Sequence, residues 1–358
     1  MRRSTTASLR AEAVELQVRI LAAAPREPVV FVDGLAPTGS PVVLELSHWP
    51  GNRTPAKLRH DLSTGCALAF ARLPRSERER LARNAVAFAN NHYDTDGTLA
   101  LFAARHPRLA LPRAEKLLAA ASAGDFFRWP SDEALAVDAI VSGRASLFAN
   151  DDDLSRWNRC TRHLMEELPA ILDGDLEPWR ALWEPVLDAA RADRGDLASC
   201  RRRDVAALDL TLFLAPAGSR STRAGAATGR FDPGRHALFG ATDKDRAAVL
   251  APGADGTTCR LVVSTLSWFD LVSERRLPRP DLASLAARLD ALEGTAPTGS
   301  HAWRAQSAGN ASPELWFGGA GLESFAEHND CLAPSRLAPE VLIAEIERAL
   351  ATGAKGTR

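Results

Sequence analysis

Short runs of apolar residues, each closed by polar turn residues, dominate the first quarter of the chain. The runs lie at 28–34, 41–48 and 85–92, and segments with helical spacing of apolar residues lie at 63–73, 76–84 and 97–105. Continuous apolar strands are typical of a parallel sheet that is covered on both faces. The pattern therefore predicts an α/β fold with a mostly parallel sheet and flanking helices.

A helical block follows this sheet in the middle of the chain. Apolar residues recur there with i, i+3, i+4 spacing over 113–123, 132–143, 153–172 and 178–200. Charged residues occupy the opposite face of each of these segments. We therefore expect a helical block over about 111–200. Together with the preceding sheet it makes up the first predicted domain, residues 1–200.

Strand patterns return after Arg203 and predict a second, smaller α/β lobe over 201–358. The expected strands are 205–215, 237–242, 261–266 and 314–317, and the expected helices are 281–292 and 339–351. A loop rich in glycine, serine, alanine and arginine occupies 217–235. This second lobe is the predicted substrate-binding part of the molecule.

Composition and charge narrow the class of protein. The chain has 358 residues, a net charge of −1 and 46% hydrophobic residues, which excludes a disordered chain and the basic surface of a protein that binds long nucleic acid. No apolar run reaches the length of a membrane-spanning helix, and the basic start lacks the apolar stretch of a signal peptide. Five scattered cysteines without a CxxC pair indicate reduced thiols. We expect a bacterial-type cytoplasmic protein without a membrane partner; the pattern does not define an oligomeric state.

Candidate chemistry is concentrated in the segment Asn-Asn-His-Tyr-Asp-Thr-Asp-Gly at 90–97, which follows a predicted strand. If the segment is extended, the side chains of His92, Asp94 and Asp96 point to one side. An imidazole and two carboxylates suit a hard or borderline divalent cation, so these are the predicted catalytic and metal-binding residues. Asp94 to Gly97 also fits a helix N-cap and turn, which is the alternative interpretation.

The single tyrosine of the chain, Tyr93, lies inside this segment. Strand alternation turns its side chain away from the neighbouring candidate ligands. A buried phenol needs a hydrogen-bond partner, so we expect Tyr93 to hold the segment in shape and not to act in catalysis.

Further candidate ligands end two other predicted strands, Asp33 and His48. The carboxyl ends of parallel strands share one edge of the sheet, where ligands bind. Together with the first three residues they could hold one or two cations, an arrangement that activates water and binds a phosphoryl oxygen. Asp125, after a predicted helix, is a sixth candidate metal ligand; a turn residue at a helix end is its alternative role.

Three arginines of the glycine-rich loop, Arg220, Arg223 and Arg230, are the candidate substrate-binding residues. Guanidinium groups bind phosphate and carboxylate with paired hydrogen bonds. We expect them to hold a small anionic substrate across a cleft from the metal site. A solvated loop is the alternative interpretation.

The motif His-x-Asp-x-Asp-Gly at 92–97, followed by a helix of small and apolar residues, resembles the first motif of the DHH phosphoesterase superfamily. The segment 29–33 resembles that superfamily's strand with a single metal-binding Asp. The segment 44–49 lies where the superfamily has a strand and Asp-His-His, and 61–64 resembles the Ser/Thr-bearing helix start that follows. The resemblance implies manganese as the cation and phosphodiesters, polyphosphates or short oligonucleotides as substrates.

The chain departs from the DHH pattern in two ways. Ser47 and Trp49 replace the Asp and the second His, and only His48 of the triplet remains. The elements around Asp33 and His48 also precede His92, whereas in the superfamily they follow it. The segments 46–52 and 91–97 also resemble a family of uncharacterised bacterial proteins. This second resemblance implies no function.

These observations lead to one main hypothesis and two alternatives. The main hypothesis is a divalent-metal-dependent, phosphoesterase-like hydrolase that acts on a small phosphorylated or anionic substrate. Because Asp-His-His is incomplete, the first alternative is a non-hydrolytic small-molecule-binding or biosynthetic accessory protein on a DHH-like scaffold. The second alternative is an interaction module formed by the helical block.

Overall fold

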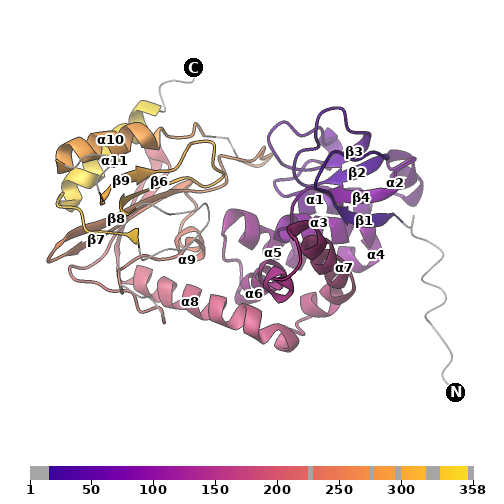
Figure 1. Cartoon of the computed structure of the whole chain (residues 1–358), viewed down its shortest axis with the longest axis horizontal. Coiled ribbons are helices and arrows are strands. Elements are labelled where there is room, and N and C mark those ends of the chain that lie inside the picture. Colours follow the sequence, from indigo (N-terminus) through magenta and orange to yellow (C-terminus); the bar gives the residue numbers. More distant parts are fainter. Residues whose placement is uncertain (1–15, 225–228, 275–276, 295–299, 320–330, 354–358) are drawn as a thin grey trace. The chain divides into compact units, whose positions relative to one another are not determined.

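The computed structural model describes residues 16–224, 229–274, 277–294, 300–319 and 331–353 (Figure 1). These residues form two compact units. The described residues of the first unit lie within Met1–Asp125, Pro130–Glu184 and Phe269–Arg275, and those of the second within Phe126–Trp129, Pro185–Trp268 and Arg276–Arg358. No helix in the described part of the chain is long and apolar enough to cross a membrane.

The first unit is built on a parallel sheet of four strands. In spatial order these are β1 (Gln17–Ile20), β4 (Ala87–Asn90), β2 (Val29–Val32) and β3 (Val42–Leu46). All three pairings are parallel, and β2 and β4 are buried along their whole length. The parallel, covered sheet predicted from the apolar runs is therefore confirmed.

The edge strand β1 was not expected, because its sequence Gln-Val-Arg-Ile is polar in part. The Arg19 side chain lies at the surface, where it bonds Gln17 and Glu27. The last residue of the strand, Ile20, is paired through its backbone N–H and C=O with the Asn158 side chain, at 2.9 Å each. A helix side chain thus covers the hydrogen-bonding edge of the sheet.

Helices α1 to α7 complete the first unit: α1 (Ser63–Arg72), α2 (Arg75–Leu81), α3 (Thr95–Arg105), α4 (Pro107–Ala110), α5 (Ala114–Phe126), α6 (Asp132–Gly143) and α7 (Asp153–Leu172). α3 is buried from Thr95 to Ala104 and packs on α1. The helical block is confirmed, and the bounds of α6 and α7 are those expected from the sequence. Short 3-10 helices lie at Ala56–Leu58, Leu111–Arg113, Arg144–Phe148, Glu177–Trp179 and Ala206–Leu208.

The second unit contains a mixed sheet in the order β5-β6-β7-β8-β10-β9. The strands are β5 (Arg201–Val205), β6 (Leu210–Leu214), β7 (Arg246–Gly253), β8 (Gly256–Val263), β9 (Ala302–Ala305) and β10 (Glu314–Gly318). Among the described strands of this sheet, β6 and β7 are paired in parallel and the other neighbours are antiparallel. Alternate residues build two cores: Leu212 packs in the core with α10 (Leu282–Glu293) and α11 (Pro339–Gly353), and Phe213 in the core with α9 (Arg235–Gly240). The α/β class predicted for both parts of the chain is confirmed.

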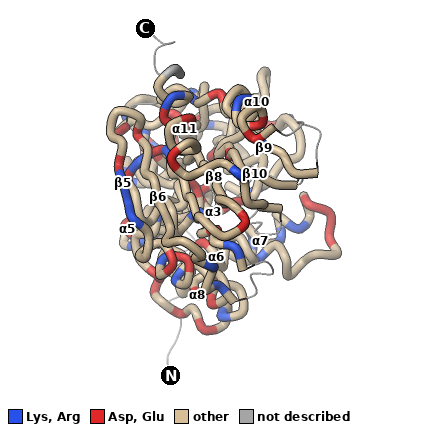
Figure 2. Tube along the Cα trace, turned by 90° about the vertical axis from the view of Figure 1, so that its left-hand side faces the viewer, with Lys and Arg blue, Asp and Glu red and all other residues tan. Residues whose placement is uncertain are grey.

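One expected strand of the second unit was wrong, and three of its strands, β5, β7 and β9, were not predicted. The segment 237–242, expected to be a strand, forms most of α9, since a short buried apolar run fits a helix as well as a strand. The next strand, β7, begins at Arg246. The edge strand β5 was missed because it begins with three exposed arginines, Arg201 to Arg203 (Figure 2). α8 (Arg180–Ala198) contains the division between the two units, before Pro185.

Candidate metal centre

Three strands of the first sheet end at the same edge and deliver the candidate ligands there. Asp33 follows β2, His48 follows β3 by one intervening residue, and His92 follows β4 by one intervening residue. Asp33 has a left-handed backbone with a φ of 59°, a conformation that Asp tolerates better than most residues. The predicted convergence of these residues at the carboxyl ends of the strands is confirmed.

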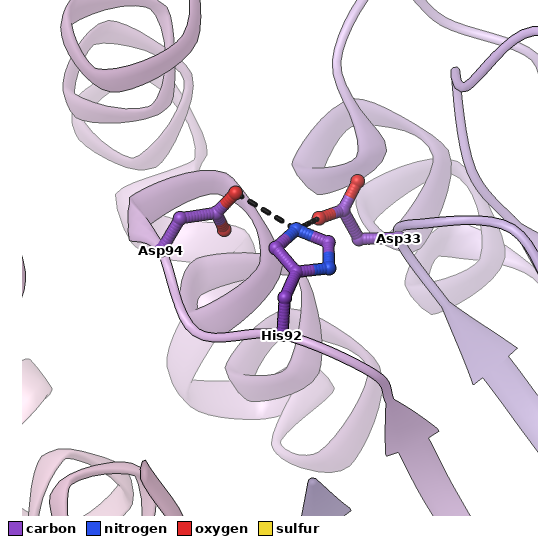
Figure 3. A group of neighbouring side chains, drawn as sticks. All are labelled: Asp33, His92 and Asp94. Carbon is purple, nitrogen blue, oxygen red and sulfur yellow. Dashed lines mark hydrogen bonds and ion pairs between the residues drawn. The ribbon is translucent and has the colours of Figure 1, made fainter. Parts of the chain in front are cut away.

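The first group of ligands consists of Asp33, His92 and Asp94 (Figure 3). His92 Nε2 lies 2.9 Å from Asp33 Oδ2 and 2.9 Å from Asp94 Oδ2. The other ring nitrogen, Nδ1, lies 2.9 Å from Asn91 Oδ1, and a proton on Nδ1 directs the lone pair of Nε2 toward the two carboxylates. The His92 and Asp94 side chains are 25% and 37% exposed, so this group is open to solvent.

The second group consists of Asp33, His48 and Asp96 and is fully buried. His48 Nε2 lies 3.8 Å from Asp33 Oδ1 and 3.6 Å from Asp96 Oδ2. His48 Nδ1 lies 2.5 Å from the backbone carbonyl of Asp61, which can only accept, so Nδ1 carries a proton. Phe269 stacks on the His48 ring with centroids 3.8 Å apart.

Asp125 lies beside this second group. Its Oδ2 is 3.0 Å from His48 Nε2, so the structure brings the sixth candidate ligand to the cluster. Asp33 belongs to both groups: its Oδ2 faces His92 and its Oδ1 faces His48 and accepts a hydrogen bond of 2.7 Å from Ser63 Oγ. We call the six residues Asp33, His48, His92, Asp94, Asp96 and Asp125 the His/Asp cluster.

The extended path expected through residue 96 was wrong, because α3 already begins at Thr95. Asp94 is the N-cap of α3 and accepts a hydrogen bond of 2.8 Å from Gly97 N. Asp96 lies in the first turn and points to the second group instead of the first. The N-cap interpretation and the ligand interpretation therefore both fit Asp94.

Tyr93 points away from the cluster, as expected. Its phenol donates a hydrogen bond of 2.6 Å to the backbone carbonyl of Val141 in α6. This bond ties the segment that carries His92 and Asp94 to the helical block.

The charges of the cluster are strongly coupled. Burial alone would disfavour both charged histidines, but the facing carboxylates outweigh it and raise the pKa of His48 to about 9 and that of His92 well above its ordinary value. Burial raises the pKa of Asp96 to about 6 and that of Asp125 well above its usual range. For Asp33, burial is opposed by His92, His48 and Ser63, so its pKa is lowered.

Side chains of the cluster approach the backbone closely at residue 97 because that residue is glycine. A Cβ on Gly97 would lie 2.9 Å from Asp33 Oδ2 and from Asp94 Oδ1, and closer still to Asn90 Nδ2. Asn90 is buried, and its Nδ2 has no hydrogen-bond partner among the described residues. The sequence singled out the segment that contains Asn90 and Gly97 but not these two roles.

The three candidate substrate-binding arginines lie in the second unit. Arg223 Nη2 forms an ion pair of 2.6 Å with the buried Asp193 and also donates to the Asp232 carbonyl. Arg220 and Arg230 face each other in an antiparallel bridge. The structure thus brings two of the arginines together and places the third in a buried ion pair.

Fold and site define an α/β protein with a His/Asp cluster that could hold metal ions. The chain belongs to the Family of unknown function (DUF6687), whose model matches residues 20–358. Neither the curated proteins nor the solved structures contain a significant match.

Proposed function

We propose that the protein is a divalent-metal-dependent, phosphoesterase-like hydrolase whose reaction centre is the His/Asp cluster. The observation that carries the proposal is the position of Asp33. Each of its two carboxylate oxygens faces a different histidine, His92 or His48, within a separate group of three potential ligands. A carboxylate placed in this way could serve two neighbouring cations, one in each group.

The residues present fit divalent cations on three counts. Imidazole nitrogen and carboxylate oxygen are the donors that manganese and similar ions accept. With both histidines deprotonated, the four carboxylates would carry negative charge that divalent cations could neutralise in a largely buried place. Glycine at residue 97 lets Asp33 Oδ2 and Asp94 Oδ1 approach the backbone more closely than any side chain there would allow.

Asp33, His92 and Asp94 would hold one ion, and Asp33, His48, Asp96 and Asp125 a second. When bound, such ions lower the pKa of water and polarise a phosphoryl oxygen. Manganese is our proposal for the ion, from the resemblance of 92–97 to the DHH superfamily.

The protein's own side chains orient the cluster. The Asp61 carbonyl fixes the proton on Nδ1 of His48 and thereby leaves Nε2 to the cluster. Phe269 covers the His48 ring and excludes water from the second group. His48 Nε2 and Asp125 Oδ2 lie 3.0 Å apart, and both would have to be deprotonated to hold a cation. The more exposed His92 and Asp94 form the side at which an anionic substrate meets the cluster.

The two residues that depart from the DHH pattern take other roles here. The Ser47 hydroxyl donates a hydrogen bond of 2.7 Å to the Gly34 carbonyl and so holds the turn after Asp33. The Trp49 ring lies against the His92 ring, with centroids 5.2 Å apart. We propose that Trp49 forms an apolar wall beside the open group. Arg220 and Arg230 remain our candidates for anion binding in the second unit.

The test is turnover by the full-length protein loaded with Mn²⁺, with bis(p-nitrophenyl) phosphate and pyrophosphate as probes. The proposal predicts Mn²⁺-dependent hydrolysis of at least one probe and a loss of at least about a hundredfold in Asp94→Asn and Asp33→Asn. Hydrolysis that persists in both variants contradicts the assigned centre. Bound Mn²⁺ without turnover of either probe favours the non-hydrolytic alternative.

A further inference from the structure

A cavity of about 230 Å³ lies in the first unit, away from the His/Asp cluster. Helices α1 and α3 both begin at the cluster, where Asp96 accepts a hydrogen bond from Ser63 N. Their far ends line the cavity, at Phe70 on α1 and from Ala104 onward on α3. The helix rise from Asp96 to Ala104 is about 12 Å, so the cavity is separate from the cluster.

The floor of the cavity is apolar. It is formed by Leu16, Phe70, Ala82, Phe88 and Ala104, none of which is more than 7% exposed. The Phe70 and Phe88 rings meet edge to face, with centroids 6.3 Å apart. A cavity with such walls favours a hydrocarbon over water.

The rim of the cavity carries an excess of positive charge, from Arg75, Arg78, Arg105 and Arg108 against the single carboxylate of Glu79. Arg75 Nε donates a hydrogen bond of 2.7 Å to Glu79 Oε1, so the charge of Glu79 balances that of Arg75. Arg78 donates to the backbone carbonyls of Ala71 and Leu73, and these acceptors carry no net charge. The rim therefore suits an anionic group.

His106 also lines the cavity. Its burial and the neighbouring Arg105 lower the pKa of His106 to about 4, so the ring is neutral near pH 7. The ring lies 5.5 Å from the Phe102 ring, centroid to centroid. His106 therefore adds no charge to the rim of the cavity.

We propose that this cavity binds a medium-chain aliphatic carboxylate, with its chain on the apolar floor and its carboxylate at the arginine rim. A cavity of about 150 Å³ holds benzene, so about 230 Å³ holds a chain of roughly eight carbons. The arginines select an anion over an alcohol of the same length. The proposal uses none of the cluster residues and stands whether or not the protein is a hydrolase.

Calorimetric titration of the full-length protein with sodium octanoate tests this site. We expect saturable binding of one octanoate per chain. Octan-1-ol, which has the same chain without the charge, is expected to bind at least about tenfold more weakly. No octanoate binding at millimolar concentration, or equal affinity for octan-1-ol, overturns the proposal.

Variants locate the site within the chain. Arg105→Gln, at the rim, is expected to weaken octanoate binding about tenfold and leave the fold intact. Ala104→Leu, on α3, and Ala82→Leu, directly after α2, fill the floor from two places and are expected to abolish binding. Arg80→Gln is the matched control, because Arg80 lies on α2 but outside the cavity and is expected to bind as the wild type. Wild-type affinity in folded Arg105→Gln and in a folded floor variant overturns the assignment.

Discussion

The carboxylate of Asp96, in the first turn of α3, accepts a hydrogen bond of 2.7 Å from the backbone N–H of Ser63, the first residue of α1. Its other oxygen accepts from Thr64 N at 2.8 Å. One buried side chain thus satisfies two of the free N–H groups at the start of α1 and at the same time faces His48. Asp96 links the packing of two central helices to the second group of ligands.

Because of this double role, replacement of Asp96 by alanine is expected to reduce stability as well as metal binding. Asp96→Ala leaves two buried N–H groups without an acceptor, at a cost of about 1–3 kcal/mol for each. Asp96→Asn keeps one acceptor oxygen and is expected to unfold at a higher temperature than Asp96→Ala. Thermal unfolding of both metal-free variants measures the difference, and equal midpoints contradict the capping role.

A second prediction concerns the close approach of Asp33 and Asp94 to Gly97. Gly97→Ala places a Cβ between Asp33 and Asp94 and is expected to weaken Mn²⁺ binding at least about tenfold. Gly195→Ala is the matched control, since a Cβ there meets no atom within 4 Å and alanine favours a helix interior. The two variants are compared by Mn²⁺ titration. Wild-type affinity in Gly97→Ala speaks against a cation held by Asp33 and Asp94.

Tyr93→Phe tests whether the phenol stabilises the segment that carries His92 and Asp94 without taking part in metal binding. The change removes the hydrogen bond to the Val141 carbonyl but keeps the ring, so we expect a loss of about 1 kcal/mol in the free energy of unfolding. Urea denaturation measures this loss. The number of bound Mn²⁺ ions is expected to stay unchanged, and a lower number would show that the phenol acts on the cluster.

The pH dependence of stability contains a contribution from His106. In the unfolded chain the pKa of a histidine is near 6.5, whereas burial and Arg105 lower the pKa of His106 to about 4 in the folded state. The stabilising contribution is therefore fully present above about pH 6.5 and is lost as the pH falls toward 4. Urea denaturation at several pH values between 7 and 4 is expected to show a smaller loss in His106→Gln than in the wild type. Parallel losses would contradict the lowered pKa.

The sequence predicted the cluster well where strand ends decide the geometry. Asp33, His48 and His92 each follow an apolar run, and parallel strands bring their carboxyl ends to one edge whatever the details of packing. Asp94 and Asp96 could be assigned to the cluster but not to its separate groups. That split depends on where α3 begins, and helix starts are poorly defined by pattern alone.

Other parts of the site depend on tertiary packing. Phe269 stacks on His48 from a segment more than 200 residues away, and no local pattern indicates that contact. Asp125 could be named only as one of two alternatives, because the position of a helix end is set by how the helix packs. The charged edge strand β5 and the short helix α9 were misjudged for a related reason. Edge strands tolerate charge, and a short apolar run fits either element.

The central claim is that Asp33 joins two cation sites, and metal content tests it most directly. Equilibrium dialysis of the full-length protein against Mn²⁺, followed by elemental analysis, is predicted to give two ions per chain. Asp33→Asn is predicted to lose both ions; asparagine suits the left-handed backbone at this position, so the fold is kept. Asp173→Asn is the control and is predicted to keep both ions, because Asp173 is an exposed carboxylate paired with Arg113. A wild-type protein that binds no Mn²⁺, or an Asp33→Asn variant that binds as much as the wild type, would contradict the account.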